Sequence, residues 1–144
     1  MSQTAKERAL REAVAQRARL RCEYCRLPEL WTSLPFQLDH VIAEKHAGET
    51  NLDNLAYVCL HCNSFKGPNL SGRDTETGEI VRLFNPRRDR WRDHFQWDGS
   101  VLCALTAIGR VTIAVLRVNL SYRVSVRSSL LEEGVFIEIV EESP

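Results

Sequence analysis

Two pairs of cysteines stand out among the residues that could do chemistry. Cys22 and Cys25 form one C-x-x-C pair, and Cys59 and Cys62 form a second one. Four thiolates in two such pairs can surround one zinc ion, with each pair forming an edge of the tetrahedron. A site closed by four thiolates has no open position, so we expect the zinc to be structural and to contribute roughly 10 kcal/mol or more to folding. The alternative is that these cysteines are redox-active or simply buried.

The fifth cysteine and three histidines are expected to lie outside any metal site. Cys103 lies in the apolar run VLCALTAI and is interpreted as a small buried core residue. His61 lies inside the second cysteine pair, but four thiolates already complete the zinc shell. His46 lies in a polar stretch and is expected to be exposed. His94 has tryptophans and arginines nearby and is expected to pack, with substrate contact as the alternative.

A further group of polar residues lies between and directly after the cysteine pairs. LDHV at residues 38–41, Asn-Leu at 54–55 and CLHCNSFKG at 59–67 occur in this order. Together they resemble the HNH endonuclease family, and the resemblance covers roughly residues 20–68. It implies a ββα-metal fold, also called a His-Me finger, with a structural zinc on the two C-x-x-C pairs.

The resemblance also implies a role for four residues. His40 would be the general base, and Asp39 and Asn63 would be the protein ligands of a catalytic divalent metal. Asn54 would organise the loop that orients His40. Many members of the family carry histidine where this chain has Asn63. An amide oxygen is a harder ligand than imidazole, so this difference favours Mg²⁺ or Mn²⁺ as the catalytic metal.

These residue types also suit phosphodiester hydrolysis on chemical grounds. The reaction needs a base that activates water and a cation that neutralises charge on the phosphate. Alternation along a strand would send Asp39 and His40 to opposite sides, so that one can hold metal while the other addresses a water. Imidazole, with an ordinary pKa of about 6.5, is well matched to base work near neutral pH.

Each of these residues also has a purely structural interpretation. Asp39 could cap a turn, His40 could be a hydrogen-bonded core histidine, and Asn63 could cap a short helix. Lys66 could contact a DNA phosphate or cover the end of that helix. The order of the whole motif favours the catalytic interpretation, because the structural one requires three independent coincidences.

Periodicity predicts the elements that must position the motif. Thr4 and Glu7 form a capping box, so residues 4–19 are expected to be an amphipathic helix that leads to the first cysteine pair. The rest of the motif is expected to contain a short strand at 35–41, a polar loop at 43–53, and a short helix that opens at CNSFK and stops at Gly67 and Pro68.

The remaining elements are predicted from turn residues and apolar spacing. We expect a hairpin at 74–84 around Thr77-Gly78, and a short helix at 87–95 in which two aromatic residues are four positions apart. Residues 109–119 suit a strand by composition and a buried helix by length, and helix is favoured. A final helix should end at Gly134, after which a short strand could follow.

Length and composition indicate one domain, and the predicted helices and short strands, together with the resemblance, give it an α+β class. The chain has 144 residues, 44% of them hydrophobic, which suffices for one continuous core. We expect a single domain over 1–144, with the zinc and HNH core at 20–68 and an accessory, largely helical segment at 69–144. The longest apolar stretch is too short for a bilayer, and the N-terminus lacks a signal sequence, so we expect a cytoplasmic protein without membrane association.

Charge is balanced overall but unevenly distributed. Nineteen basic and nineteen acidic residues cancel, so net charge gives no argument for a nucleic-acid partner. Residues 1–26 and 82–92 are nevertheless rich in arginine, whose planar fork suits phosphate. These segments could steer a DNA backbone, or they could equally be solvated surface.

The sequence therefore predicts a metal-dependent endonuclease that acts on DNA, with zinc as structural metal and Mg²⁺ or Mn²⁺ as catalytic metal. The alternative is a catalytically inactive, zinc-stabilised module that binds nucleic acid or protein. A thiol redox protein is a third class, but it would need a free, reactive C-x-x-C pair.

Overall fold

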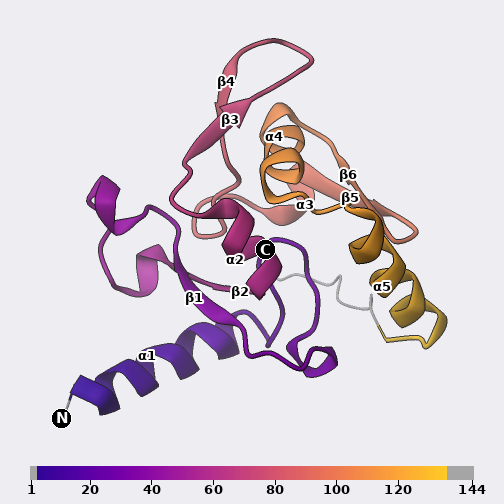
Figure 1. Ribbon diagram of the computed structural model, residues 1–144. Helices are drawn as coiled ribbons and strands as arrows, with labels where there is room; N and C mark the ends of the chain where they lie inside the picture. The colour runs from indigo at the N-terminus through magenta and orange to yellow at the C-terminus, as the bar shows by residue number, and fades with distance from the viewer. Residues whose placement is uncertain (1–2, 136–144) are drawn as a thin grey trace.

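The computed structural model describes residues 3–135 as a mixed α+β protein with three two-stranded antiparallel sheets (Figure 1). The strand pairs are β1 (Gln37–His40) with β2 (Leu55–Val58), β3 (Ser71–Arg73) with β4 (Ile80–Arg82), and β5 (Phe95–Asp98) with β6 (Val101–Ala104). The helices are α1 (Gln3–Arg17), α2 (Leu60–Lys66), α3 (Trp91–His94), α4 (Ala107–Leu116) and α5 (Ser121–Glu132). Short 3₁₀ turns are η1 (Glu29–Trp31), η2 (Glu44–His46) and η3 (Leu52–Asn54). The expected α+β class is confirmed.

The predicted N-terminal helix is present as α1. Val14 and Ala15 on its inner face are buried, and the helix packs against β2. Just beyond its end, Arg19 and Leu20 adopt left-handed backbone conformations with φ of 57° and 58°. This region is disfavoured for residues other than glycine. The two residues turn the chain sharply toward the first cysteine pair.

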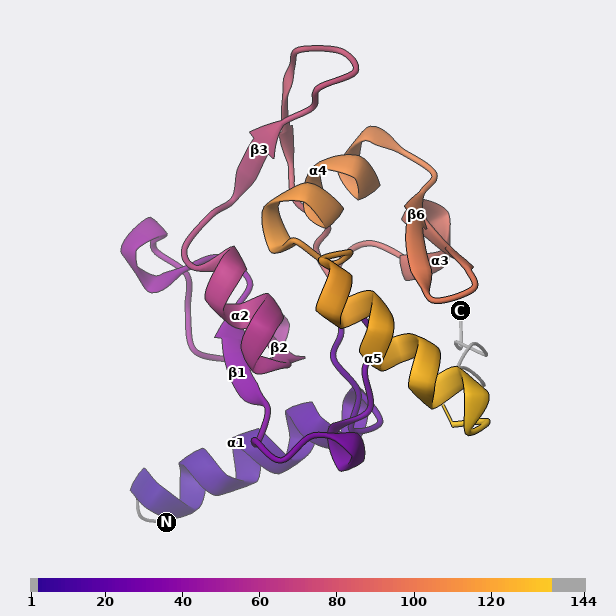
Figure 2. The same ribbon diagram turned by 45° about the vertical axis from the view of Figure 1, so that its right-hand side comes forward.

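The predicted strand at 35–41 is present as β1, which pairs with β2 in antiparallel register. Gln37 lies opposite Val58, and His40 lies opposite Leu55. The loop between the strands contains η2 and η3, and it extends from the sheet on the side away from α5 (Figure 2). The loop is therefore more structured than its polar sequence predicts.

The helix α2 follows β2 after a single residue. It begins at Leu60, slightly earlier than predicted, because Cys59 acts as its N-cap: the Sγ atom of Cys59 accepts a hydrogen bond from the N–H of Cys62. Gly67, with φ of 49°, ends the helix as predicted. The second cysteine pair is thus part of the helix start.

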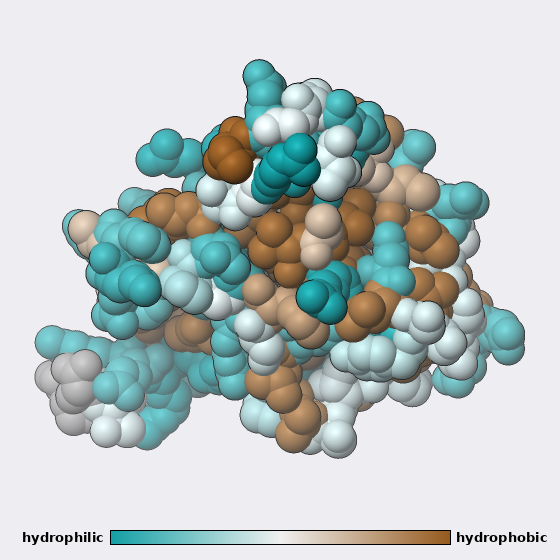
Figure 3. Space-filling view, turned by 45° about the horizontal axis from the view of Figure 1, so that its top comes forward, coloured by the Kyte–Doolittle hydropathy of each residue, from teal (hydrophilic) through white to brown (hydrophobic). Residues whose placement is uncertain are grey.

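The predicted hairpin is present as β3 and β4, but its first strand lies before the predicted range of 74–84. The strands are joined by a turn in which the N–H of Asp74 donates to Glu79 and Gly78 has φ of 80°. The hairpin extends away from the rest of the molecule beside α4 (Figure 1). Figure 3 views the molecule with the hairpin end turned forward. Apolar residues lie at the centre of this face, and hydrophilic residues surround them.

The predicted helix at 87–95 is wrong at both ends, because α3 covers only Trp91–His94. Helix α3 stops at His94, and Phe95 begins a second hairpin, β5–β6, which turns at Gly99 with φ of 62°. Trp91 and Phe95 nevertheless contact each other, with ring centroids 5.2 Å apart. The interpretation of Cys103 as a core residue is wrong as well: it is only half-buried, because the alternation of β6 directs Leu102 inward instead.

The helical interpretation of residues 109–119 is confirmed by α4, which Thr106 caps by accepting a hydrogen bond from Gly109. The final helix is confirmed as α5, and Gly134 follows its end with φ of 75°. The strand predicted after Gly134 lies outside the described residues.

One cluster of buried residues extends from α1 to α5. It joins the cysteine-bearing segment to the C-terminal half, for example through the indole N–H of Trp91, which donates to the carbonyl of Tyr24 at 2.9 Å. Tyr24 also packs edge-on against Phe84. No helix among residues 3–135 has the length and apolar character needed to cross a membrane.

Candidate active site

The four paired cysteines converge on one buried point. The Sγ atoms of Cys22, Cys25, Cys59 and Cys62 all lie within 4.8 Å of one another, and none is in a disulfide. Within each pair, the second cysteine donates its backbone N–H to the Sγ of the first at 3.4 Å. This arrangement holds four sulfur donors where one tetrahedral ion could bind, so the predicted clustering is confirmed and its chemistry fits zinc.

An arginine from the far end of the chain completes this cluster. Arg123 on α5 donates from Nη2 to Cys25 Sγ at 3.5 Å and to Cys59 Sγ at 3.3 Å. Burial alone would lower the pKa of Arg123, but the surrounding cysteines raise it. Hydrogen bonds from neighbouring thiols, helped by Arg123, lower the pKa of Cys25. No sequence pattern pointed to Arg123, since its contacts depend on how α5 packs.

His61 is not part of the cysteine cluster, as expected. Its Nδ1 atom lies 2.7 Å from the Tyr122 hydroxyl, and its Nε2 atom lies 3.1 Å and 3.0 Å from the carbonyls of Leu116 and Arg117. Burial lowers the pKa of His61, which favours the neutral ring. Its role in this structure is to join α2 to the C-terminal helices.

Asp39 and Lys66 form a buried ion pair between β1 and α2. Asp39 is 6% exposed and Lys66 is 1% exposed. The Nζ atom of Lys66 lies 3.0 Å from Oδ2 and 3.3 Å from Oδ1 of Asp39, and it donates to the carbonyl of His40 at 3.2 Å. Burial raises the pKa of Asp39, although Lys66 partly opposes this. The interpretation of Lys66 as a phosphate contact has no support, because its Nζ points inward.

A second contact between β1 and α2 lies beside this ion pair. Asn63 donates from Nδ2 to Oε1 of Gln37. Gln37 and Asp39 are two residues apart and share one face of β1, whereas Asn63 and Lys66 are three apart and share one face of α2. Asp39 and Asn63, the two predicted metal ligands, therefore lie on the two sides of the same interface, where Asp39 contacts Lys66 and Asn63 contacts Gln37. Sequence reasoning overlooked Gln37, although its spacing from Asp39 was a usable signal.

His40 lies on the opposite side of β1 from Asp39, as the alternation predicts. Its side chain is 25% exposed. Its Nε2 atom lies 2.8 Å from the Thr50 hydroxyl and 4.0 Å from a carboxylate oxygen of Glu44. Which partner donates depends on the ring tautomer. The imidazole is thus accessible to water and contacts Thr50 in the loop that contains η2 and η3. The sequence analysis did not identify Thr50 as a site residue.

Asn54 fixes the backbone that follows His40. Its Oδ1 accepts from the N–H of Ile42, and its Nδ2 donates to the carbonyls of Ile42 and Glu49, each at 2.9 Å. Its own carbonyl accepts from the N–H of Val41 at 2.8 Å. Gly48 is required here, because a Cβ atom would lie 1.6 Å from the Ile42 carbonyl oxygen. This geometry is what a loop-organising asparagine would need.

The other two histidines lie apart from these groups. His46 is exposed on η2. His94 is half-buried: its Nδ1 atom lies 2.7 Å from the Thr106 hydroxyl, and its ring packs edge-on against Phe84. The packing interpretation of His94 therefore agrees with the structure.

The oxygen donors between β1 and α2 fit a small, hard cation. Oδ2 of Asp39 is buried and accepts no hydrogen bond of ordinary geometry, even though the Lys66 ammonium is close. Asn63, with Nδ2 donated to Gln37, can offer its amide oxygen. Carboxylate and amide oxygens are typical Mg²⁺ and Mn²⁺ ligands. In this structure the positive charge beside Asp39 is that of Lys66.

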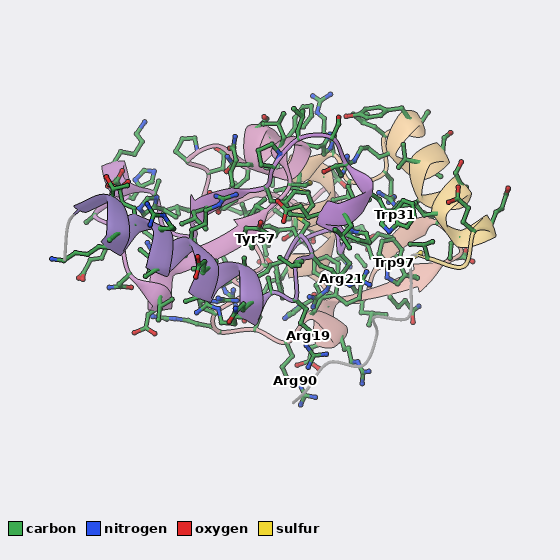
Figure 4. All side chains as sticks on the ribbon, turned by 90° about the horizontal axis from the view of Figure 1, so that it is seen from below. Arg19, Arg21, Trp31, Tyr57, Arg90 and Trp97 are labelled. Carbon is green, nitrogen blue, oxygen red and sulfur yellow. The ribbon has the colours of Figure 1, made fainter. Side chains whose placement is uncertain are left out.

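The two arginine-rich segments meet on one side of the molecule. Figure 4 shows Arg19, Arg21 and Arg90 on the underside, and the guanidinium of Arg26, which follows Cys25, lies over the ring of Trp91 at 4.9 Å from its centroid. Some arginines of these segments instead form ion pairs with acidic residues of the protein. The pairs are Arg82 with Asp89 and Arg87 with Glu23.

Taken together, the fold and site define a small α+β protein with a buried four-cysteine cluster and an adjacent Asp-His pair. A family model described as HNH endonuclease matches residues 22–69, so the resemblance of this segment to an HNH endonuclease domain is confirmed. Such a domain indicates nuclease activity on nucleic acids and binding of divalent metal. No curated protein and no solved structure matches the chain.

Proposed function

We propose that this protein is a metal-dependent endonuclease that hydrolyses phosphodiester bonds of DNA. The observation that carries the proposal is the arrangement around β1. Asp39 and Gln37 on β1 contact Lys66 and Asn63 on α2, while the adjacent His40 contacts Thr50 in the loop that Asn54 fixes. A metal-binding side and a base-bearing side are thus one residue apart, as a ββα-metal site made of β1, β2 and α2 requires.

In this proposal His40 takes the proton from the attacking water. Its partial exposure lets water reach the ring, and its contact with Thr50 limits the ring orientation. Asp39 and Asn63 hold Mg²⁺ or Mn²⁺, which when bound neutralises charge on the scissile phosphate and the leaving oxygen. Asn54 contributes indirectly, because it fixes the backbone on either side of the base.

The four cysteines serve as a structural zinc site. Cys62 and Asn63 are adjacent, and Cys59 caps α2, so an ion on the thiolates would fix the start of the helix that carries Asn63 and Lys66. We propose that residues 20–68 form this nuclease core and that residues 69–144 are an accessory part of the same single domain. The arginines on the underside would contact DNA phosphates.

One observation favours a second candidate, a catalytically inactive module that binds nucleic acid or protein. Lys66 already neutralises Asp39 in a buried position, so the protein does not need a divalent cation to compensate that carboxylate. A module of this kind would need zinc for folding but would be indifferent to Mg²⁺ or Mn²⁺.

The test is cleavage of supercoiled plasmid and of single-stranded RNA by zinc-loaded protein, with and without added Mg²⁺ or Mn²⁺. Asp39→Asn is compared with Asp53→Asn, which changes an exposed carboxylate on η3. Nicked or linear plasmid that requires added metal and is lost only in Asp39→Asn supports the proposal. A folded protein that shifts DNA in a gel but cleaves neither substrate supports the binding module.

A further inference from the structure

We propose that Lys66 is a built-in counter-ion that sets how tightly the Asp39 site binds a divalent cation. The inference rests on the proposed function, because it concerns the same metal site. In this role Lys66 acts inside the protein on Asp39. The Lys66 side chain is buried and therefore does not contact nucleic acid.

The Lys66 ammonium makes two hydrogen bonds, to Asp39 Oδ1 and to the His40 carbonyl, and an ion-pair contact with Asp39 Oδ2. An ammonium has three donors. The Nζ atom has three oxygens within reach: Asp39 Oδ2 at 3.0 Å, Asp39 Oδ1 at 3.3 Å and the His40 carbonyl at 3.2 Å. Lys66 therefore contacts both the predicted metal ligand and the backbone of the predicted base.

Burial explains why such a charge is needed. A buried carboxylate without a counter-charge strongly destabilises a fold. Asp39 is 6% exposed, so in the metal-free protein Lys66 supplies the positive charge that lets β1 and α2 pack. The same face of α2 carries Asn63, so the helix brings both a neutral ligand and a cation to the strand.

The same arrangement must weaken metal binding. A divalent cation on Asp39 would lie close to the ammonium, and like charges repel strongly at short distance in a buried site. Oδ2 of Asp39 accepts no well-aligned hydrogen bond, so it remains a suitable ligand atom, but its negative charge is shared with Lys66. The site therefore combines stability without metal with moderate metal affinity.

The experiment measures Mn²⁺ binding to zinc-loaded protein by electron paramagnetic resonance, together with thermal unfolding with and without Mn²⁺. Lys66→Met and Lys66→Gln remove the charge, Lys66→Arg retains it, and Lys45→Met removes an exposed charge in the neighbouring loop. We expect the Mn²⁺ dissociation constant of the neutral variants to fall about tenfold or more. Lys66→Arg and Lys45→Met should bind Mn²⁺ within about twofold of the wild type.

Stability supplies the second readout. Without Mn²⁺ the neutral variants should unfold at a lower temperature than the wild type, and Mn²⁺ should raise their unfolding temperature more than it raises that of the wild type. A neutral variant that folds only with Mn²⁺ also supports the proposal. If both neutral variants remain unfolded with Mn²⁺, the metal does not replace the ammonium and the proposal is overturned.

The outcomes separate this inference from the proposed function. The wild type could cleave DNA with Mn²⁺ while the folded neutral variants bind Mn²⁺ no more tightly than the wild type. This result would overturn the role of Lys66 but would leave the proposed nuclease function standing. If neither the wild type nor the neutral variants bind Mn²⁺ and no cleavage occurs, both the inference and the proposed function fail.

Discussion

The side-chain amide of Asn54 pairs with both backbone groups of Ile42, accepting from its N–H and donating to its carbonyl at 2.9 Å each. A side chain thus does what a strand partner would do, two residues beyond His40. The loop that carries Thr50 and Gly48 depends on this pairing, so the orientation of the proposed base depends on a residue that does not contact it.

Asn54→Ala should loosen this loop and reduce metal-dependent cleavage by about tenfold or more, since misplaced catalytic groups lose rate steeply. The unfolding free energy should fall by about 1–3 kcal/mol, because three backbone groups lose their partner. Hydrogen exchange at Ile42 reports the loop directly. Asn51→Ala is the matched control, as it removes only the cap of η3. Full cleavage with an unchanged Ile42 exchange rate in Asn54→Ala would contradict this role.

Gly48→Ala should be strongly destabilising. The new Cβ atom would lie 1.6 Å from the Ile42 carbonyl oxygen, so the backbone must move. We expect a loss of about 3 kcal/mol or more in urea denaturation, at the upper end of the usual overpacking cost. Gly99→Ala is the control, because a methyl group added there would have no other atom within 4 Å. Its positive φ should cost only about 1 kcal/mol. Equal losses in the two variants would show that the contact at Gly48 is unimportant.

Removing a thiolate should release the structural ion and unfold the protein. Cys59→Ser removes one sulfur ligand, whereas its hydroxyl can still accept the N–H of Cys62 and cap α2, so the variant tests the ion site rather than the cap. Structural zinc sites contribute on the order of 10 kcal/mol to folding, which exceeds the stability of many domains. Elemental analysis and circular dichroism should show about one zinc per chain in Cys103→Ser and none, with lost helix, in Cys59→Ser. A folded, zinc-free Cys59→Ser protein would argue against the assignment.

Asp74 and Arg110 provide a pH-dependent link between the β3–β4 hairpin and α4. Both carboxylate oxygens accept from Arg110 at 2.9 Å, and these bonds lower the pKa of Asp74. The unfolded carboxyl has a pKa of about 3.9, so the pair stabilises the fold above roughly pH 4 and loses this contribution as pH falls further.

The free-energy difference between wild type and Arg110→Gln should therefore be constant above about pH 5 and shrink below about pH 4. Urea denaturation across this range measures it. Arg73→Gln, a change on the exposed side of the same hairpin, should show no such trend. A wild-type advantage over Arg110→Gln that grows on acidification would reverse the expected sign.

Local signals in the sequence predicted most of the motif correctly. Apolar spacing indicated α1, although the helix starts at Gln3, before the Thr4 of the predicted capping box. Strand alternation indicated the opposite facing of Asp39 and His40, and the cysteine spacing indicated the four-thiolate cluster. These features depend on neighbours a few positions away. Local propensity and hydrophobic periodicity are therefore sufficient to predict them.

The features that sequence could not provide depend on packing between distant segments. Arg123 reaches the thiolates only because α5 packs against the cysteine cluster, and Lys66 turns inward only because Asp39 faces α2. The β5–β6 hairpin was missed because Trp91 and Phe95 have helical spacing although their contact spans a helix end and a strand start. Tertiary context overrides such short-range patterns.

The most direct test of the nuclease assignment is the single-turnover cleavage rate of supercoiled plasmid for His40→Ala at saturating Mn²⁺, beside wild type and His46→Ala. His46 lies exposed on η2, so its removal controls for loss of an imidazole near the site. We predict that His40→Ala cleaves at least about 100-fold more slowly with zinc content and fold unchanged, whereas His46→Ala matches wild type. If His40→Ala cleaves the plasmid at the same rate as the wild type, the assignment of His40 as general base is wrong.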